Sequence, residues 1–456
     1  MNSQISHLFD EKKRNRADLR ALGLSLRERV SRRSHAHWEP DQQRPDPVEI
    51  LRGQEEDRVQ ELVPIRYGRM AASPFAFFRG AAAVMSWDLA QTPVCGVHVQ
   101  ACGDAHADNF GTYASPERRI VFDINDFDET LPAPWEYDIK RLAVSIILAA
   151  RNQGWGDEVG LDSVRTAIRR YSTMLHLLSQ KTTLEIHFAH TETSQLIEET
   201  TDPRLVGALQ GIVEKARRRT HLQVFEKEVT GKDGQLRFVE NPPLLVRLPD
   251  DEIEHFHKLF NTYRATLQDN RRHVLERYRF RDAARKVVGV GSVGLRAYVL
   301  LLQGRGDPDP LLIQVKQAVS SVLSPFLGRS GFARHGQRVV TGQRLMQAVS
   351  DPFLGWSDFA QRDYYLRQLR DMKGQAGPAD SPYVFEAGMS LCAATLARAH
   401  ARSVDPAILS GYLGEDGGAF VESIAAFARI YADQSERDYE RFVDVIRKGE
   451  LPAAEL

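Results

Sequence analysis

Residues 102–110, with the sequence CGDAHADNF, carry the side chains best suited to chemistry in this chain. Asp104 and Asn109 stand five positions apart, with His106 between them. Carboxylate and amide oxygens suit Mg²⁺, whereas zinc would want more histidine or cysteine than this stretch supplies. The stretch therefore predicts a magnesium site or a catalytic loop, and a solvated polar turn is the plain alternative.

A second acidic run, DINDFDET at residues 123–130, follows shortly after. The sequence between the two runs reads as strand, turn and strand. Asp126, which precedes a phenylalanine, is predicted to be a further metal ligand, and Asp128 is predicted to add a second carboxylate. Asp123 competes with Asp126 for this role, because the sequence does not fix the length of the preceding strand.

Phosphoryl transfer needs side chains with this spacing. One aspartate accepts the proton of the acceptor hydroxyl, an asparagine five residues later holds Mg²⁺, and a further aspartate completes the metal site. Asp104, Asn109 and Asp126 match these roles in chain order. We therefore expect ATP and Mg²⁺ as cofactors, with Asp104 as a catalytic residue.

A glycine-rich string, GVGSVG, places Gly289, Gly291 and Gly294 in G-x-G-x-x-G spacing, with Ser292 among them. Such glycines let backbone N–H groups approach a phosphate closely. A dinucleotide-binding fold needs a helix after this string, but the apolar run LRAYVLLL predicts a strand. Strand, loop and strand are how kinases cover ATP phosphates, and Lys316 at the end of LLIQVK is expected to steady those phosphates during catalysis.

The composition excludes several other classes of protein. The 456 residues contain 60 Lys and Arg against 61 Asp and Glu, so no overall field favours nucleic acid or an anionic membrane. Three scattered cysteines argue against disulfides or structural zinc and favour a reducing cytoplasm, and the acidic neighbours of Cys102 disfavour a reactive thiol. The chain opens without an apolar signal, and its most apolar stretch is too short to span a membrane. We expect a cytoplasmic protein without a membrane contact.

Changes of pattern along the chain divide it into four segments. Residues 1–47 form a polar, arginine-rich arm, and residues 48–280 form a helical lobe that holds the candidate catalytic loop and the metal-binding acids. Residues 281–375 form a β-rich nucleotide lobe, and residues 376–456 form helices that return to the helical lobe. The arm is expected to be a helical extension, with docking to nucleic acid or a partner as the alternative. These segments predict an α+β fold with two lobes.

The strings GDAHADN, DFDE and WEYDIKRLAVS resemble the G-D-x-H-x-x-N, I-D-F and D-P-x-x-D-L-A series of aminoglycoside phosphotransferase-like kinases. This resemblance implies that Asp138 opens a helix and braces the catalytic loop, and Cys102 stands where those kinases usually have a structural histidine. A wider set of strings is similar to the bacterial family called domain of unknown function 2252 and covers most of residues 64–405. They are RYGRMAASPFAFFRG, CGDAHADNFG, FDINDFDETLPAPWEYDIKRLAVS, VVGVGSVG, QVKQA, GQRVVTGQRLMQAVSDPFLGW, YYLRQLRDMKG and LARAHARS. That resemblance implies a protein-kinase-like relative and brings no substrate.

The order of the motifs differs from that of ordinary kinases, in which the glycine loop and the lysine precede the catalytic aspartate. The string ATLARAHARS at residues 394–403 resembles the helix that normally runs into the catalytic loop, and LRDMKG resembles the hinge between lobes. We therefore predict a circular permutation of the protein-kinase-like fold. The chain would bring Lys316 back to Asp126.

One kinase element is altered, because the predicted helix after Lys316 contains no glutamate to pair with that lysine. Arg338 and Arg344 on this helix are candidates to contact phosphates, and Glu129 is a candidate partner for Lys316. The expected function is phosphoryl transfer from ATP to a hydroxyl of a small molecule or protein. AMP transfer to a protein and nucleotide binding without turnover stay open, and the sequence indicates neither the acceptor nor the oligomeric state.

Overall fold

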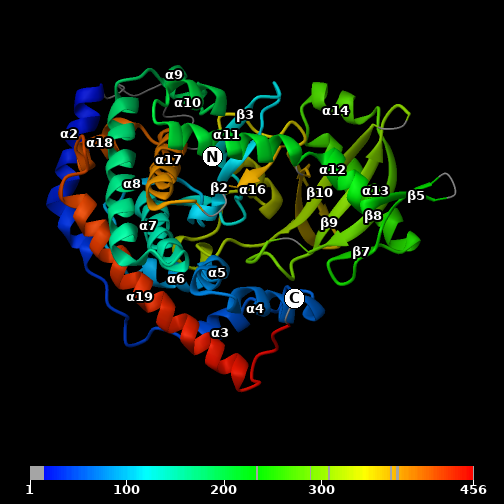
Figure 1. Cartoon of the computed structure of the whole chain (residues 1–456), viewed down its shortest axis with the longest axis horizontal. Helices are drawn as coiled ribbons and strands as arrows, with labels where there is room; N and C mark the ends of the chain where they lie inside the picture. Colours follow the sequence, from blue (N-terminus) through cyan, green and yellow to red (C-terminus); the bar gives the residue numbers. More distant parts are fainter. Residues whose placement is uncertain are drawn as a thin grey trace.

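The computed structural model describes residues 15–232, 235–287, 289–306, 309–369, 372–375 and 379–454. These residues form a mixed α+β fold in which a helical part lies beside a six-stranded antiparallel sheet (Figure 1). The first residues of the predicted arm, 1–14, and residues 370–371 of the predicted hinge lie outside the described residues. In the described part of the chain, no helix combines the length and the hydropathy that a membrane crossing needs.

Amphipathic helices build the helical part, and their apolar faces meet in the largest hydrophobic core. The helices are α2 (Arg16–Arg29), α7 (Trp135–Asn152), α8 (Gly156–Ser179), α17 (Pro382–Ala401), α18 (Pro406–Leu413) and α19 (Ala419–Arg447). Helix α8 packs against both α7 and α17, and α2 packs against α18. Trp135 stacks on Tyr171 across the α7–α8 contact, with ring centroids 5.9 Å apart. The predicted arm therefore contributes a helix that belongs to this core.

The six-stranded sheet has the order β11-β12-β10-β9-β8-β7, and all its neighbours are antiparallel. Its strands are β7 (Leu245–Arg247), β8 (Arg279–Lys286), β9 (Ala297–Gln303), β10 (Pro310–Ala318), β11 (Gly355–Phe359) and β12 (Arg362–Gln368), and helix α16 (His335–Met346) connects β10 to β11. The glycine string lies between the paired strands β8 and β9, which confirms the predicted strand, loop and strand. Lys316 lies opposite Ala297 on one side and Tyr365 on the other, so it is central in the sheet.

The two faces of this sheet are covered by different elements. Leu300, Leu302 and Ile313 pack in one core with helix α13 (Asp250–Ala265). Val299 and Leu301 pack in another core with helix α12 (His221–Glu228) and the hairpin formed by β5 (Val229–Lys232) and β6 (Gln235–Phe238). The period of two along β9 sends alternate side chains to the two faces. Both faces of the central strands are buried as a result.

The acidic stretches lie in short strands and turns between the sheet and the helices. Strand β1 (His98–Ala101) pairs with β4 (Leu131–Pro134), and β2 (Phe110–Ala114) pairs with β3 (Ile120–Ile124) and with β13 (Gly374–Gln375). The 102–109 loop connects β1 to β2 and ends in the short helix η4 (Ala107–Asn109), and the acidic turn, residues 125–130, connects β3 to β4. The predicted strand, turn and strand between the two acidic runs is confirmed.

A helical segment before β1 reaches from the helices to the glycine string. It contains α3 (Pro47–Arg52), η3 (Gln60–Leu62), α4 (Val63–Ala71), α5 (Pro74–Gly80) and α6 (Ala82–Leu89), and it follows η2 (Arg32–Ala36). Tyr67 and Phe77 of this segment pack against Phe442 near the end of α19. In Figure 1 the C-terminal end of the described chain lies beside α4, where the backbone N–H of Ala454 donates to the carbonyl of Pro64.

Five further helices complete the described part of the chain. They are α9 (Thr183–Phe188), α10 (Thr193–Glu199), α11 (Pro203–Arg218), α14 (Asp269–Leu275) and α15 (Ser324–Leu327). Helix α11 contacts β2 and β13.

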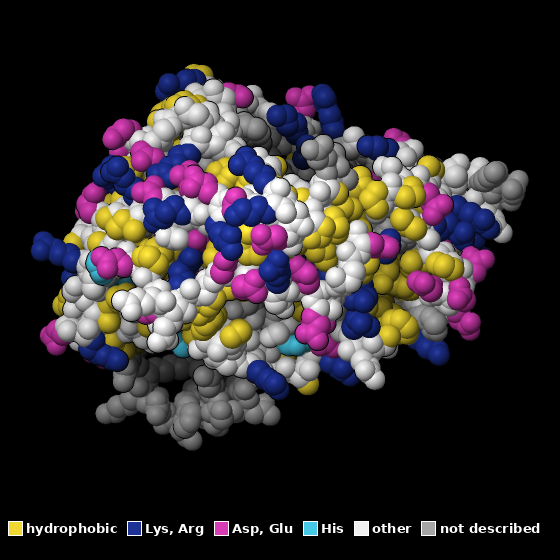
Figure 2. Space-filling model, turned by 90° about the horizontal axis from the view of Figure 1, so that it is seen from below, with side chains coloured by type: hydrophobic (Ala, Val, Ile, Leu, Met, Phe, Trp, Pro, Cys, Tyr) yellow, Lys and Arg dark blue, Asp and Glu magenta, His cyan; other side chains and the backbone are white. Residues whose placement is uncertain are grey.

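Positive and negative side chains are interspersed over the face shown in Figure 2, as expected for a chain with a formal net charge of -1.

Candidate functional site

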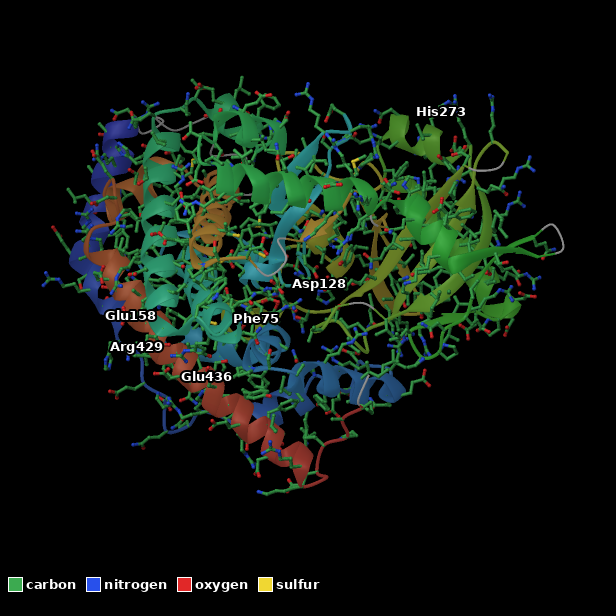
Figure 3. The ribbon with its side chains drawn as sticks, in the orientation of Figure 1. Phe75, Asp128, Glu158, His273, Arg429 and Glu436 are labelled. Carbon is green, nitrogen blue, oxygen red and sulfur yellow. The ribbon has the colours of Figure 1, made fainter. Side chains whose placement is uncertain are left out.

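A cavity of about 1140 Å³ lies where the glycine loop (residues 289–294), the 102–109 loop and the acidic turn come together. All of the predicted site residues except Gly294 line it. They are Asp104, Asn109, Asp126, Asp128, Gly289, Gly291, Ser292 and Lys316. Figure 3 labels Asp128 between the helical part and the sheet. The fold therefore gathers into one cavity side chains that lie as much as 212 residues apart, as Asp104 and Lys316 do.

The 102–109 loop is held at its start by Asp138 in the first turn of α7. The backbone N–H groups of Cys102 and Gly103 donate to the two carboxylate oxygens of Asp138, at 2.6 and 2.9 Å. His400 near the end of α17 contacts the same carboxylate, with Nε2 3.1 Å from Oδ2. Charge-assisted bonds to buried N–H groups are among the stronger hydrogen bonds in proteins. Asp138 therefore braces the loop and is itself held by a helix from the other end of the chain.

Gly103 is needed because the loop passes very close to the acidic turn. Its φ is +81°, and a Cβ at this position would lie 2.4 Å from the carbonyl oxygen of Glu129. The preceding residue, Cys102, is fully buried, and burial together with the charge of Asp138 raises the pKa of its thiol well above the usual value. The thiol is therefore poorly suited to act as a nucleophile.

Asp104 is paired with a buried arginine that sequence reasoning did not identify. Arg141 Nε donates to Asp104 Oδ1 at 2.5 Å, and the Arg141 side chain is only 3% exposed. Arg141 also donates to the carbonyl of Phe78 at 3.0 Å and lies over the Phe78 ring. The second oxygen, Asp104 Oδ2, lies 3.9 Å from His106 Nε2. Burial lowers the pKa of His106 to about 4, so this ring is neutral at pH 7 and Asp104 Oδ2 remains free of a second cation.

Asn109 joins the 102–109 loop to the acidic turn. Its amide nitrogen donates to the carbonyls of Asp104 and Asp126, both at 3.0 Å, and its Oδ1 accepts from the backbone N–H of Asp126 at 2.8 Å. A carbonyl oxygen has two lone pairs, so Oδ1 keeps one acceptor site after this bond. The side chain therefore fixes the position of Asp126 while retaining the capacity for one metal contact.

Lys316 makes ion pairs with both aspartates of the acidic turn. Its Nζ lies 3.3 Å from Asp126 Oδ2 and also contacts Asp128 Oδ2. Although burial raises the pKa of Asp126, the positive charges of Lys316, Arg367 and Lys373 outweigh burial and bring this pKa down to about 2. Asp126 is therefore ionised at neutral pH, and its Oδ1 has no hydrogen-bond partner among the described residues.

Asp128 is an acidic partner of Lys316. The helix after Lys316 contains no glutamate for this role. Both of its oxygens are used, because Oδ2 contacts Lys316 and Oδ1 accepts from the Tyr365 hydroxyl at 2.8 Å. The prediction that Glu129 pairs with Lys316 is wrong. Glu129 Oε2 accepts from the backbone N–H of Val322 at 2.7 Å, and burial raises its pKa to about 7. The lysine-positioning acid thus comes from the turn that also carries the candidate metal ligand.

Helix α16 contacts the acidic turn through backbone groups. The Arg338 guanidinium is buried and donates to the carbonyls of Thr130, Asp128 and Val319 at 2.6, 2.7 and 2.8 Å. Arg344 donates to the carbonyl of Leu354. Neither arginine lines the cavity. Their suggested contact with phosphates in this cavity is therefore not supported. Arg338 instead holds the turn against the sheet.

The alternative metal ligand, Asp123, is buried on β3 and does not line the cavity. Its Oδ1 accepts from the N–H of Ile124, and burial raises its pKa despite the charges of Arg402 and Arg398. Asp126 is the member of this pair that faces the cavity. The structure thus separates two positions that the sequence left as alternatives.

The glycine loop is held from outside by the arginine segment, which we define as residues 54–80. Arg69 donates to the carbonyl of Gly289 at 2.6 Å, and the N–H of Val59 donates to the carbonyl of Gly294 at 2.8 Å. Gly294 has a φ of +91°, and a Cβ there would lie 3.1 Å from the Arg58 side chain. Gly294 therefore serves the contact with this segment, while Gly289, Gly291 and Ser292 line the cavity.

The acidic turn and its neighbours suit Mg²⁺ only together with phosphate oxygens. In the described residues, no cluster of three or more His, Cys, Asp or Glu side chains is arranged to hold a metal ion alone. Asp126 Oδ1 and Asn109 Oδ1 are hard oxygen donors on adjacent backbone, and Mg²⁺ commonly binds through one or two protein oxygens plus substrate phosphates. The donor set fits that mode of binding.

Several charged residues that line the cavity could not be singled out from the sequence. Arg367 donates to Gln314 and to the carbonyl of Asn125, and it lines the cavity beside Asp126. Arg141 follows Asp138 by three positions, so both side chains lie on neighbouring positions of one helix face. The basic side chains that line the cavity are Arg58, Arg66, Arg69, Arg79, Lys215, Arg218, Arg219, Lys286, Lys316, Arg367 and Lys373. They outnumber the acidic ones, which indicates an anionic ligand.

Comparison with known proteins gives the family of the chain. No curated protein and no solved structure matches it. One family model matches residues 58–445, a span that contains all but the first four residues of the arginine segment, together with the 102–109 loop, the acidic turn, the glycine loop and Lys316. The chain therefore belongs to the bacterial family DUF2252, which is described as an uncharacterized protein conserved in bacteria.

Proposed function

We propose that the protein is an ATP- and Mg²⁺-dependent phosphotransferase with a circularly permuted, protein-kinase-like fold. The observation that carries the proposal is the contact of Lys316 Nζ with Asp126 Oδ2 at 3.3 Å. A lysine on the third strand of a strand, glycine loop, strand and strand unit, facing an aspartate after a short hairpin, is the arrangement with which kinases bind ATP phosphates and Mg²⁺. Asp104 and Asn109 lie on the adjoining loop in the same cavity.

The end of α17 supports the permutation. Ser403, just after this helix, accepts from the backbone N–H of Gln100 at 2.8 Å, and Gln100 lies in β1 immediately before the 102–109 loop. In an unpermuted chain this helix would run into that loop. Here the two segments are 303 positions apart in sequence, yet a backbone N–H of one donates to a side-chain hydroxyl of the other. The contact between His400 and Asp138 at the same place favours the same interpretation.

The chain's own residues would divide the work of the reaction as follows. Mg²⁺, when bound by Asp126 and Asn109, would neutralise charge on the phosphates. Lys316, held by Asp128, would position the phosphates under the glycine loop. Asp104 Oδ2 would accept the proton of the acceptor hydroxyl while its Oδ1 stays bonded to Arg141. The acceptor oxygen forms a bond to the γ-phosphorus as the bond from that phosphorus to the β–γ bridging oxygen breaks, which yields ADP and the phosphorylated acceptor.

AMP transfer to a protein is the second candidate, and one feature of the cavity favours it. Lys215, Arg218 and Arg219 line the cavity from α11 and the residue after it, and α11 contacts β13, which begins at the last residue of the predicted hinge. Kinases commonly hold the adenine near the hinge, where an apolar slot suits a base. Basic side chains there would suit the phosphates of a nucleotide bound in the reverse direction.

Doubly labelled ATP separates these possibilities. The protein would be incubated with Mg²⁺ and with ATP that carries one label on the γ-phosphate and another on the adenine, across small-molecule and protein acceptors. Transfer of the γ-label alone is the expected result. Transfer of the adenine label would establish AMP transfer instead, and ATP binding with neither label transferred would favour a nucleotide-binding protein without turnover.

A further inference from the structure

The arginine segment contains a guanidinium that the described residues satisfy only in part. Arg66 on α4 is fully buried, and its Nη2 donates to Gln54 Oε1 at 2.8 Å and to the carbonyl of Gly80 at 3.2 Å. Its Nε and Nη1 are also buried, and they have no hydrogen-bond partner among the described residues. Buried polar groups in proteins are almost always hydrogen-bonded, so such atoms require an explanation.

No carboxylate among the described residues forms an ion pair with Arg66. The acid whose charge acts on the pKa of Arg66 is Glu55, and its Oε1 accepts from the Tyr67 hydroxyl. Burial lowers the pKa of Arg66, and Glu55 and Tyr67 offset this effect only in part. A buried charge is costly unless a counter-ion and hydrogen bonds compensate it. A ligand that brings a negative charge would supply both.

A second buried arginine lies beside the first. Arg58 is 8% exposed, and burial, followed by the nearby charge of Arg66, lowers its pKa to about 9. Its Nη1 donates to the carbonyl of Val293 in the glycine loop, and its Nε donates to the carbonyl of Gln54. These acceptors are neutral carbonyls, and the charges of Glu129 and Asp128 offset the effect of burial on the pKa of Arg58 only in part. Two adjacent guanidinium groups of this kind are suited to bind an oxyanion.

The pair of arginines belongs to the wall of the cavity that also includes the glycine loop and Asp104. Arg58 and Arg66 both line the cavity, and so does Arg79 at the end of the same segment. Arg79 Nη1 pairs with Asp108 of the 102–109 loop at 2.9 Å, whereas its Nε is buried and has no hydrogen-bond partner in the part of the chain that the structure describes. The arginine segment thus spans from the loop that would cover the nucleotide phosphates to the loop that would receive the acceptor.

We propose that Arg58 and Arg66 form an oxyanion subsite that binds a phosphate group at the glycine-loop end of the cavity. The phosphate belongs to the acceptor or to the nucleotide, and the chemistry of recognition is the same for both. The assignment to an acceptor rests on the proposed phosphotransferase function, whereas the subsite itself does not. If the subsite serves the acceptor, acceptors with a phosphate near the reacting hydroxyl are the class to screen.

Inorganic phosphate is the probe that tests the subsite without a nucleotide. Phosphate would be titrated into the full chain by calorimetry, with sodium chloride at the same ionic strength as the reference. Wild type is expected to bind phosphate, and Arg66→Met and Arg58→Met are each expected to weaken binding at least tenfold. Arg52→Gln is the matched control, because Arg52 lies on the neighbouring helix α3, is 38% exposed and does not line the cavity.

If a variant of a buried arginine fails to fold, hydrogen exchange on the wild-type protein still tests the subsite. Phosphate is expected to slow amide exchange in residues 54–80 and in the glycine loop. Absence of phosphate binding and of this protection, or equal binding by wild type and Arg66→Met, would overturn the subsite.

Two further arms identify the source of the phosphate. If phosphate still binds when a non-hydrolysable ATP analogue and Mg²⁺ are saturating, the subsite serves the acceptor. If the analogue displaces phosphate, the arginines hold the phosphates of the nucleotide. Asp126→Asn is expected to weaken binding of the Mg²⁺–nucleotide at least tenfold while phosphate binding survives, so a failure of the proposed function is distinguishable from a failure of the subsite.

Discussion

Lys316 Nζ and Asp126 Oδ2 lie 3.3 Å apart although 190 residues separate them in the sequence. The lysine is 3% exposed and the aspartate side chain 44%, so the pair lies on the wall of the cavity with its acidic member open to a ligand. In the proposed phosphotransferase these two groups meet the phosphates and the metal from opposite lobes.

Replacing Lys316 by methionine is expected to lower turnover by ~10²–10³-fold, because one positioned cation is lost from the transferring phosphoryl group. The same change leaves Asp126 and Asp128 without their shared counter-ion, which is expected to lower the free energy of unfolding by about 3 kcal/mol. Chemical denaturation and ATP turnover would be measured on the same samples. Lys181→Met is the control, because Lys181 is 55% exposed on the surface. Undiminished turnover by Lys316→Met would contradict the role given to the lysine.

Asp126 and Asp128 are expected to respond differently to conversion to asparagine. Asp126→Asn removes the candidate metal ligand, so Mg²⁺-dependent nucleotide binding should fall by at least tenfold. Asp128→Asn removes the acid that positions Lys316 and accepts from Tyr365, so the KM for ATP should rise while the concentration of Mg²⁺ required changes little. Titrations of Mg²⁺ at fixed ATP, and of ATP at fixed Mg²⁺, separate the two effects. Equal responses would show that both aspartates share one role.

Glu129 is expected to make stability fall as pH rises from about 4.5 to about 7. Burial raises its pKa from 4.5 to about 7, so the native carboxyl keeps its proton over a range in which the unfolded chain has released it. The native state then binds more protons than the unfolded state, and the free energy of unfolding decreases with pH by an amount on the order of 1–3 kcal/mol. Glu129→Gln keeps an acceptor for the Val322 N–H and removes the titration. Urea denaturation at pH 5 and pH 8 should show that wild type loses more stability than the variant, and parallel curves would contradict the prediction.

Asp138→Asn is expected to destabilise the 102–109 loop and to lower turnover together. The carboxylate accepts two backbone N–H groups and contacts His400, and an asparagine cannot accept at both of its side-chain ends. One buried N–H left without an acceptor costs about 1–3 kcal/mol. Asp162→Asn, at a side chain that is 65% exposed on α8, is the control. Thermal unfolding would report the loss, and an unchanged melting temperature for Asp138→Asn would show that the brace is dispensable.

The sequence predicted those parts of the site whose residues lie close to one another in the chain. Asp104 with Asn109, the glycine string and the strand that carries Lys316 each depend on neighbouring residues and on periods that can be read locally. The contact between Lys316 and the acidic turn was predicted only by analogy with kinases, because nothing local indicates where β10 will meet a turn from residues 125–130. The mixed α+β class also followed from the alternation of helical and strand patterns.

The partners of the charged residues could not be predicted, because they depend on how closely elements pack. Helix α16 approaches the acidic turn at Gly342, where a Cβ would lie 2.4 Å from Thr130 Cγ2. That approach brings Arg338 to the carbonyls of the turn rather than to the cavity, and it leaves Asp128 as the acid that meets Lys316. Arg141 reaches Asp104 only because α7 runs directly beneath the loop. Single-residue preferences carry no information on such distances.

A crystal structure of the protein with a non-hydrolysable ATP analogue and Mg²⁺ tests the central proposal most directly. We predict that the β- and γ-phosphates lie under Gly289 and Gly291 within reach of Lys316, that Asp126 and Asn109 ligate the metal, and that the γ-phosphate faces Asp104 Oδ2. An analogue bound with its adenine toward Asp104 and its γ-phosphate toward Lys215 and Arg219, or bound outside this cavity, would contradict phosphoryl transfer by these residues.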